Sequence, residues 1–237
     1  WILHRNCEGT EQLRIITEPG KNRGLSMSRK GILAVVSGFS GAGKGTLMKA
    51  LLSEHADQYA LSISATTRGP REGEVDGREY FFKTKDQFEQ MIAEDALIEH
   101  ACYVGNYYGT PKSYVMEQLE AGKNVILEIE IQGARKIKEQ YPDAVLLFVT
   151  TNDAQTLKDR LTGRGTESEE VIRNRLLRAA QEAEGIEEYD YLVVNDDLDT
   201  CVNEVHGIIT SEHLKMRRRL EFVTNIREDL QGLMKGE

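Results

Sequence analysis

Nearly continuous apolar runs alternate along this chain with segments whose apolar residues recur at helical spacing. Apolar runs of this kind are typical of strands buried on both faces of a parallel sheet. Four are predicted as strands: residues 32–36, 125–131, 144–150 and 191–194. The helical spacing predicts five helices: residues 44–54, 132–140, 153–161, a segment ending near 184, and 199–217. The alternation predicts an α/β fold built on a central parallel sheet.

Shorter strand-like runs interrupt this alternation before the strand at residue 125. They cover residues 59–67, 79–82, 97–103 and 106–108. Thr84 and Gln87 have the spacing of a capping box, which predicts a helix to about residue 95. Thr110-Pro111 predicts a further helix with proline at its first position. We therefore expect a small mixed lobe, at about residues 62–112, inserted into a larger domain.

The two ends of the chain differ from its middle. Residues 1–30 show little apolar periodicity, and we expect an extension that is flexible or not native. No continuous apolar stretch is followed there by small residues, so a signal peptide is not expected. The folded domain is expected to span residues 31–214, and residues 215–237 are expected to form a helical tail.

The charge balance limits the partners of the chain. The 237 residues carry a net charge of −9, which argues against a general nucleic-acid binder. The basic run Lys215–Arg219 fits a helix end, where cations suit the helix dipole, better than a nucleic-acid site. Residues 31–214 hold 18 Lys and Arg against 32 Asp and Glu. An anion site in this region must therefore gather its few cations in one cleft.

The cysteines and the apolar runs suggest a compartment. Three widely spaced cysteines, Cys7, Cys102 and Cys201, fit neither a disulfide framework nor a zinc site. A reducing, cytoplasmic location is expected. The apolar runs are too short to cross a bilayer, so no membrane partner is expected. A homo-oligomer is compatible with the sequence.

A glycine-rich turn follows the first predicted strand and precedes the first predicted helix. It reads GFSGAGK and matches the GxxxxGK part of a phosphate-binding P-loop: Gly38, Phe39, Ser40, Gly41, Ala42, Gly43 and Lys44. Glycines let successive backbone N–H groups point at phosphate oxygens, and the helix adds its positive N-terminal end. Lys44 would reach the β- and γ-phosphates of a nucleotide. Gly45 stands where such loops usually place Ser or Thr, and Thr46 follows it. A metal ion would therefore be held mostly by phosphates and water.

Two arginines in the predicted small lobe offer a second anion site. Arg68 and Arg71 lie in a turn-rich loop, and each guanidinium can bind a phosphate through two N–H groups. Tyr80 and the pair Tyr107-Tyr108 could add hydroxyl donors. Adjacent tyrosines on a strand cannot both face inward, so at least one of the pair is expected at a surface or a site. A solvated loop would explain the arginines about as well.

Three glutamates stand in mostly apolar surroundings. Glu128 and Glu130 fall near the carboxyl end of the strand predicted at 125–131, on one face because of their spacing of two. Acids are costly in a central strand unless they are paired, and ligands of open parallel sheets bind at this end of the strands. Glu99 lies in a predicted strand of the small lobe. A solvent-facing edge strand is the alternative for Glu128 and Glu130.

A polar segment around residues 160–172 resembles a mobile lid. Arg160, Arg164 and Arg175 lie in or next to it. Lids with arginines serve phosphoryl transfer because they neutralise the transferring group and exclude water. Charges at helix ends are the alternative reading for each arginine taken alone.

Together these motifs resemble the guanylate kinase family, over residues 31–214. The matching segments stand in order: SGFSGAGKGT, SATTRGPREGEVDGREYFF, IEHACYVGNYYGTPKSYV, VILEIEIQGA, RLTGRGTESEEVIRNRL and YDYLVVNDDLD. The resemblance implies a P-loop fold of three layers with a central parallel sheet, an inserted GMP-binding lobe and an arginine-bearing lid. It implies transfer of the γ-phosphoryl group of ATP to GMP or dGMP, in purine nucleotide metabolism.

The resemblance also implies roles for particular residues. The catalytic residues would be Lys44, Arg71, Arg160, Arg164 and Arg175. ATP would contact Gly38, Phe39, Ser40, Gly41, Ala42, Gly43, Lys44, Gly45, Thr46 and Asn195. GMP would contact Ser64, Arg68, Arg71, Tyr80, Glu99, Tyr108, Thr110 and Glu130. Mg²⁺, the implied cofactor, would be bound by phosphates and water, with Thr46 and Glu128 close to that water.

The implied guanine site makes chemical sense. Guanine presents N1–H and N2–H₂ donors, which need acceptors such as Glu99 and Glu130. Adenine would place its N1 lone pair against a carboxylate, and such a mismatch rejects the wrong base strongly. Glu128 and Glu130 stand where many members have Asp, and Phe39 stands where a Pro is common. A non-catalytic interaction module and a kinase for another nucleoside monophosphate are the competing hypotheses; the intact loop and the three acceptors argue against them.

Overall fold

The computed structural model describes residues 30–103, 105–163 and 168–235. Residues 1–29 of the expected extension and Arg164 of the expected lid lie outside the described residues. Within these ranges, no helix combines the length and the apolar character that crossing a membrane requires.

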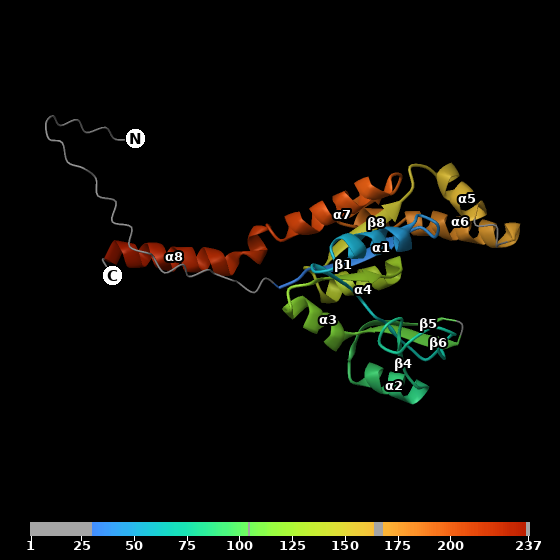
Figure 1. Cartoon of the computed structure of the whole chain (residues 1–237), viewed down its shortest axis with the longest axis horizontal. Helices are drawn as coiled ribbons and strands as arrows, with labels where there is room; N and C mark the ends of the chain where they lie inside the picture. The colour runs from blue at the N-terminus through green and yellow to red at the C-terminus, as the bar shows by residue number, and fades with distance from the viewer. Residues whose placement is uncertain (1–29, 104, 164–167, 236–237) are drawn as a thin grey trace.

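A five-stranded parallel sheet forms the centre of the molecule (Figure 1). Its strands lie in the order β2 (Tyr59–Leu61), β7 (Asn124–Glu128), β1 (Leu33–Gly38), β8 (Val145–Thr150) and β9 (Tyr191–Val194). Every neighbouring pair is parallel. The α/β fold predicted from the alternating pattern is confirmed.

Helices cover both faces of this sheet and make three layers. Helices α1 (Lys44–Glu54) and α7 (Leu198–Glu212) share one hydrophobic core with the Val36 face of β1. Helices α3 (Lys112–Glu120) and α4 (Ile131–Gln140) share the other core with the Val35 face. Successive residues of β1 point to opposite faces, so both faces must be apolar. This explains the continuous apolar run in the sequence.

The small lobe has a sheet of its own. Its four strands are β3 (Ala65–Thr66), β4 (Phe81–Phe82), β5 (Leu97–Tyr103) and β6 (Asn106–Pro111), in the order β4-β3-β6-β5. The β3–β4 pair is parallel and the other pairs are antiparallel, so the lobe is mixed as predicted. Helix α2 (Lys85–Ala93) begins at the predicted capping box of Thr84 and Gln87 and buries Phe88 against the lobe.

The segment predicted as a lid, residues 160–172, includes the end of one helix and the start of the next. Helix α5 (Ala154–Thr162) is capped by Asp153, and helix α6 (Glu169–Ala183) is capped by Ser168. The helices share a small core that includes Leu157 and Leu161. A short 3₁₀ turn, η1 (Ile186–Glu188), leads from α6 to β9.

Several predicted boundaries are wrong, and tertiary contacts explain three of them. The run 59–67 divides into β2 and β3, because the chain leaves one sheet at Leu61 and joins the other at Ala65. The helix predicted from Thr110-Pro111 starts at Lys112, because Pro111 still pairs with Leu97 in β6 and serves as the N-cap. The strand predicted to Ile131 ends at Glu128, where α4 follows almost directly, with Glu130 as its N-cap.

The C-terminal helix predicted at 199–217 ends early, at Glu212. Glu212 is buried there and accepts a hydrogen bond from Tyr191 on β9, which fixes this end of α7 against the sheet. A 3₁₀ turn, η2 (Met216–Arg218), and a separate helix, α8 (Leu220–Lys235), follow. Figure 1 shows α8 extending away from the rest of the molecule.

Candidate active site

The glycine-rich loop connects β1 to α1, as the sequence predicts. Gly43 is the N-cap of α1 and has a φ of 90°, a left-handed conformation that favours glycine. A Cβ at this position would lie 2.4 Å from Nδ2 of Asn195. Both the backbone and the available space therefore require glycine here.

Lys44, the first residue of α1, turns its ammonium group back onto the loop. Its Nζ donates to the backbone oxygens of Gly38 at 2.7 Å and Phe39 at 3.1 Å. The cation is thus held over the concave side of the loop. An anion bound there would meet this charge together with the N-terminal end of α1.

Arg160 and Asn195 support the loop from the adjacent elements. The amide Nδ2 of Asn195 donates to the Ala42 oxygen at 2.8 Å, and Nη1 of Arg160 reaches the same oxygen at 3.3 Å. Nη2 of Arg160 donates to the backbone oxygen of Asn195 at 2.8 Å. Both residues, predicted near the nucleotide, therefore contact the back of the P-loop in this conformation.

A second arginine of the lid reaches the loop from α6. Nη1 of Arg175 lies 3.1 Å from Oγ of Ser40 and donates to it. The predicted partner Arg164 is not among the described residues. Helix α6 is therefore in contact with the loop in this conformation.

One cavity joins the loop, the two acids and helix α6. It has a volume of about 600 Å³, and its lining includes Ser40, Lys44, Glu128, Glu130 and Arg175. Glu128 ends β7, an inner strand, so the edge-strand alternative is wrong. Glu130 lies beyond the strand as the N-cap of α4, so the two acids do not share a strand face.

Sequence reasoning did not single out Arg178, which forms an ion pair with Glu130. Its Nη2 lies 2.6 Å from Oε1 of Glu130, and its Nε lies 3.0 Å from Oε1 of Glu182. These ion pairs raise the pKa of Arg178, with the hydrogen bond to Glu130 as the largest cause. The spacing of four between Arg178 and Glu182 was visible in the sequence; the pairing with Glu130 was not.

Ser37 is a second residue without a predicted role. It is 1% exposed, and its Oγ donates to the backbone oxygen of Ile129 at 2.7 Å. Ile129 stands between Glu128 and Glu130. The bond therefore ties the end of β1 to the turn that carries both acids.

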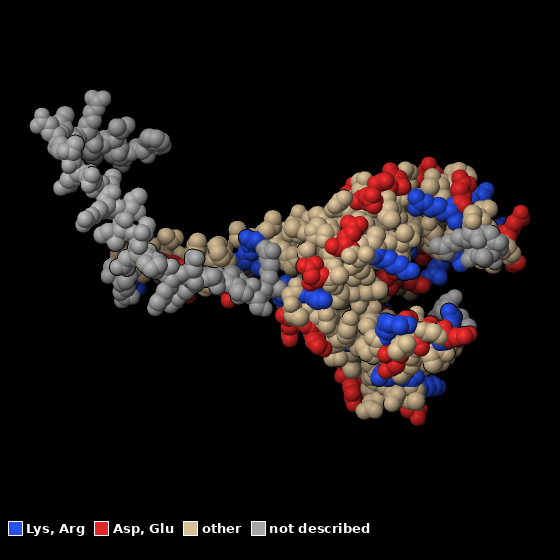
Figure 2. All heavy atoms as spheres, viewed as in Figure 1, with Lys and Arg blue, Asp and Glu red and all other residues tan. Residues whose placement is uncertain are grey.

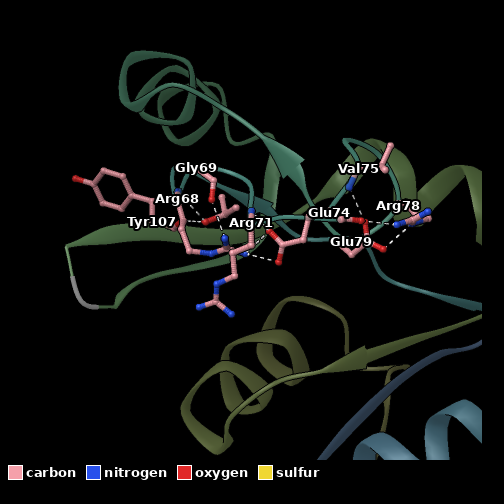
Figure 3. Close-up of polar contacts among 10 residues, drawn as sticks. Arg68, Gly69, Arg71, Glu74, Val75, Arg78, Glu79 and Tyr107 are labelled. Atoms are coloured by element: carbon pink, nitrogen blue, oxygen red, sulfur yellow. Dashed lines mark hydrogen bonds and ion pairs between the residues drawn. The ribbon is translucent and has the colours of Figure 1, made fainter.

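In the small lobe, Arg68 is held by partners that the sequence analysis had not assigned to it (Figure 3). Its Nη2 lies 2.8 Å and 3.0 Å from the two carboxylate oxygens of Glu74. Its guanidinium carbon stands 5.2 Å from the ring centre of Tyr80, a cation–π distance. The hydrogen bond from Arg68 is the largest cause of the lowered pKa of Glu74. Glu74 thus stays ionised and positions Arg68 through this ion pair.

Arg71 takes part in the same loop through its backbone. Its N–H donates to Oε2 of Glu74 at 2.7 Å. Figure 3 shows its guanidinium pointing away from Glu74, on the side of the lobe that faces the larger domain. The loop therefore presents the Arg71 side chain outward.

The two adjacent tyrosines face opposite ways, as the strand pattern predicts. Tyr107 stacks on the buried ring of Phe88. Tyr108 packs edge-on against Tyr80 with ring centres 6.2 Å apart. Tyr108 and Tyr80 therefore lie together beside Arg68.

Glu99 and Thr110 form a hydrogen-bonded pair between β5 and β6. The hydroxyl of Thr110, which is fully buried, donates to Oε1 of Glu99 at 2.8 Å. Burial raises the pKa of Glu99, and the hydrogen bond from Thr110 offsets part of this rise. Ser64 precedes β3 and accepts the N–H of Phe81 on its backbone oxygen at 2.9 Å.

The predicted site residues thus fall into two groups. The 600 Å³ cavity of the larger domain includes Lys44 and Glu130 but not the small-lobe residues Arg68, Tyr80 and Glu99. Figure 2 shows Lys and Arg side chains on both the larger domain and the small lobe, near the gap between them. Cations from both parts therefore lie near this gap, where two anions could face each other.

The site offers few protein ligands to a metal ion. No cluster of three or more His, Cys, Asp or Glu suited to a metal occurs among the described residues. Glu128 and Glu130 supply carboxylate oxygens to the cavity of Lys44, and Thr46 lies exposed in the first turn of α1. Oxygen donors suit Mg²⁺, which usually keeps water and substrate phosphates as ligands. The residues present fit an ion that arrives with a nucleotide.

Comparisons with known proteins identify similar chains. The family model described as guanylate kinase matches residues 30–212. A guanylate kinase of Oceanobacillus iheyensis is 51% identical over 86% of this chain and 98% of its own length. One from Halalkalibacterium halodurans is 50% identical over 81% of this chain and 94% of its own. The crystal structure of guanylate kinase from Anaplasma phagocytophilum covers 80% of this chain and 90% of its own, with 29% identity and a TM-score of 0.62.

Proposed function

Because this chain belongs to the guanylate kinase family, whose known reaction is phosphoryl transfer from ATP to GMP, we propose that its two groups of site residues each bind one of these nucleotides. The observation that carries the proposal is the cavity in which Lys44 faces Glu128, Glu130 and Arg175. A lysine for phosphate, an arginine next to the proposed lid, an acceptor for the base (Glu130) and an acid for the metal's water (Glu128) would then line one space.

The larger domain would bind ATP. The P-loop amides and Lys44 would take the β- and γ-phosphates, replacing the backbone oxygens of Gly38 and Phe39 as partners of Nζ. Asn195 would lie near the adenine, behind Gly43. The contacts of Arg160 and Asn195 with Ala42 support this role, because they hold the loop in shape before the nucleotide arrives.

The small lobe would bind GMP. Arg68, preorganised by Glu74 and Tyr80, would bind the phosphate with Arg71, Tyr80 and Tyr108. Ser64, Glu99, Thr110 and Glu130 would read guanine, where the donors N1–H and N2–H₂ need acceptors. Among these, Glu130 belongs to the larger domain. Closing the two parts on each other would complete the guanine site, which couples base recognition to alignment of the phosphates.

No protein nucleophile is required by this chemistry. An oxygen of the GMP phosphate attacks the γ-phosphorus of ATP in line, and ADP leaves. Lys44, Arg71, Arg160, Arg164 and Arg175 would stabilise the charge spread over the transferring group. The lid would exclude water, whose attack would hydrolyse ATP without making GDP.

Mg²⁺ is proposed as the cofactor that arrives with ATP. The ion would supply positive charge that offsets the negative charge of the β- and γ-phosphates. Two residues would accept hydrogen bonds from the water around the ion and so orient it: Glu128, exposed at the end of β7, and Thr46, in the first turn of α1.

A cytoplasmic location is proposed on the same grounds. Cys102 and Cys201 are free thiols in the described part of the chain, which suits a reducing compartment. ATP and GMP are expected as the small-molecule partners.

A coupled assay of ADP release tests the proposal. ATP and Mg²⁺ are supplied with GMP, AMP, UMP or CMP in turn. We expect turnover with GMP alone and a loss of about 10²–10³-fold in kcat for Lys44→Ala, the scale of removing one preorganised donor. Lys49→Ala, on the exposed side of α1, is the matched control and should keep full activity. Turnover with another monophosphate, or equal activity of the two variants, would overturn the assignment.

A further inference from the structure

Helix α8 is an amphipathic helix without a partner in the described part of the chain. None of its residues is buried, and it extends away from the two lobes (Figure 1). Its large apolar side chains are largely exposed, from 44% for Phe222 to 75% for Leu233 and 88% for Met234. A helix of 16 residues is marginal in water on its own. This helix therefore requires a surface that covers its apolar face.

The apolar residues of α8 form one stripe. They recur at spacings of three and four, and the stripe consists of Phe222, Val223, Ile226, Leu230, Leu233 and Met234. Val223 and Leu230 are seven apart, as are Ile226 and Leu233. This is the a and d pattern of a coiled-coil seam, which fits another helix of the same kind.

The base of α8 is fixed to the larger domain. Glu212, 1% exposed, accepts the hydroxyl proton of Tyr191 at 2.6 Å and forms an ion pair with Lys215. Arg218 donates to the backbone oxygen of Asp143, and Nε of Arg219 donates to the oxygen of His213 at 3.3 Å. These contacts hold the segment before α8 against the domain, and the helix itself runs outward from there, with its stripe exposed (Figure 1).

We propose that a second copy of this chain covers the stripe, with the two α8 helices packed as an antiparallel pair around a two-fold axis. A two-fold interface is self-complementary, and a single apolar stripe repeated on both copies satisfies that condition. The six side chains present on the order of 400–600 Å² of apolar surface in each copy, at the level of the largest patch on a typical monomer. Two such surfaces approach the area of a specific dimer interface, about 1,200 Å² at its lower limit.

The antiparallel direction follows from the position of the helix in the fold. Paired helices lie about 8–10 Å apart, and the body of each copy joins α8 directly at its N-terminal end. A parallel pair would bring both bodies to the same end at that spacing, whereas an antiparallel pair keeps them at opposite ends.

A cavity at the base of α8 supports this direction. It measures about 440 Å³, and Leu33, Met116, Leu119 and Glu221 are among its lining residues. With a length of about 24 Å, an antiparallel partner helix brings Leu233 and Met234 to the base of the first helix. Its apolar tip then lies next to this partly apolar cavity, so the interface continues from the seam onto the body.

The charges of α8 disfavour a lipid surface as the occupant. Helices that lie on membranes carry a polar face rich in Lys and Arg. Over residues 220–235, Glu221, Glu228 and Asp229 outnumber Arg227 and Lys235.

Sedimentation velocity of the full chain tests the proposal. We expect a dimer at micromolar concentrations and a monomer for the double variant Ile226→Glu, Leu230→Glu, because the seam would otherwise bury unpaired carboxylates. The dissociation constant should rise by more than about 100-fold. The matched control Thr224→Glu, Gln231→Glu adds the same charge to the opposite face of the helix and should remain dimeric. Circular dichroism of each variant checks that the body stays folded.

Cysteine cross-linking tests the direction, in a background in which Cys7 and Cys102 are replaced by Ser. Mild oxidation of mixed Val223→Cys and Leu233→Cys chains should give the mixed dimer, since these positions meet only in an antiparallel pair. Cross-links between two Val223→Cys chains alone would overturn the antiparallel arrangement. A monomeric wild type, a dimeric seam variant, or a monomer that sediments with phosphatidylserine vesicles would overturn the proposed occupant. None of these readouts depends on kinase activity, so the outcome is independent of the proposed function.

Discussion

The guanidinium of Arg178, on α6, lies 2.6 Å from the carboxylate of Glu130, at the start of α4. The same carboxylate is a proposed acceptor for guanine. In this conformation α6 therefore occupies part of the proposed base site. A GMP molecule that binds Glu130 as proposed must displace Arg178 from it, while α6 keeps its contact with Ser40 through Arg175.

Replacing Arg178 should tighten the binding of GMP. Because the pair is about half exposed, its loss is worth about 0.2–1 kcal/mol, or up to about fivefold in affinity. We expect Arg178→Gln to lower the dissociation constant for GMP by that factor and to leave ATP binding unchanged, measured by calorimetry. Arg173→Gln, on an exposed position of the same helix, is the control. Weaker GMP binding by Arg178→Gln would show that the arginine assists the base instead of competing with it.

Glu99→Gln should weaken GMP binding and stabilise the fold. The lost charged hydrogen bond is worth about 1.5–3 kcal/mol, a decrease of about 10–150-fold in GMP affinity. Burial raises the pKa of Glu99, so the folded state binds its proton more tightly than the unfolded state. At neutral pH the ionised carboxylate therefore lowers stability, and Gln removes that cost. Titration calorimetry and thermal melts give the two readouts.

The same raised pKa predicts a pH dependence for the wild type. As the pH falls through the pKa of Glu99, the guanine acceptor becomes protonated and the KM for GMP should rise. The rise should begin at a higher pH than for an ordinary glutamate, whose pKa is about 4.3. Glu99→Gln should lack this part of the profile, and the exposed control Glu94→Gln should retain it. Identical profiles for wild type and Glu99→Gln would contradict the role.

Gly43→Ala should damage the ATP half of the site. A left-handed backbone costs a residue with a Cβ about 1–2 kcal/mol, and this Cβ would lie 2.4 Å from Nδ2 of Asn195. We expect the KM for ATP to rise about tenfold and the melting temperature to fall by about 2–8 °C. Gly207→Ala, in α7 with open space around it, should instead raise the melting temperature slightly. Unchanged ATP kinetics in Gly43→Ala would contradict the proposal that close packing of Asn195 against the loop matters for ATP binding.

Glu212→Gln should destabilise the end of α7 in a pH-dependent way. Burial alone would raise the pKa of Glu212, but hydrogen bonds from Lys215 and Tyr191 outweigh it and lower the pKa. The stability that this carboxylate contributes is therefore present at neutral pH and lost as the pH falls below the ordinary range of glutamate. The melting temperature of the variant should be lower than that of the wild type at neutral pH, and the difference should shrink in acid. A difference that grows in acid would contradict this assignment.

Local patterns predicted most of the fold because local and tertiary requirements agree there. The run of β1 is apolar since both of its faces are buried, and helix α1 has the bounds that its periodicity predicted. The capping box at Thr84 predicted where α2 begins. The prediction failed where a distant residue decides, as when Tyr191 and Glu212 fix the end of α7 and the helix expected to continue stops.

The candidate site divides in the same way. Its glycines, arginines and acids are recognisable because each chemical task needs a particular residue type. The ion pairs that position these residues cannot be recognised in the sequence. Arg178 on α6 reaches Glu130 at the start of α4, and only the folded loop brings Glu74 to Arg68. Ser37 shows the limit most clearly. Nothing in the sequence distinguishes it from the other serines or indicates its hydrogen bond to Ile129.

The small lobe enters and leaves the larger domain at neighbouring points. The chain departs after β2 and returns at α3, where Tyr114 donates to the oxygen of Leu61. The lobe's own sheet and core lie entirely within that insertion. Selection can therefore reshape most of the proposed acceptor site within one contiguous stretch of the gene, because Glu130 is the one proposed guanine contact that lies outside it.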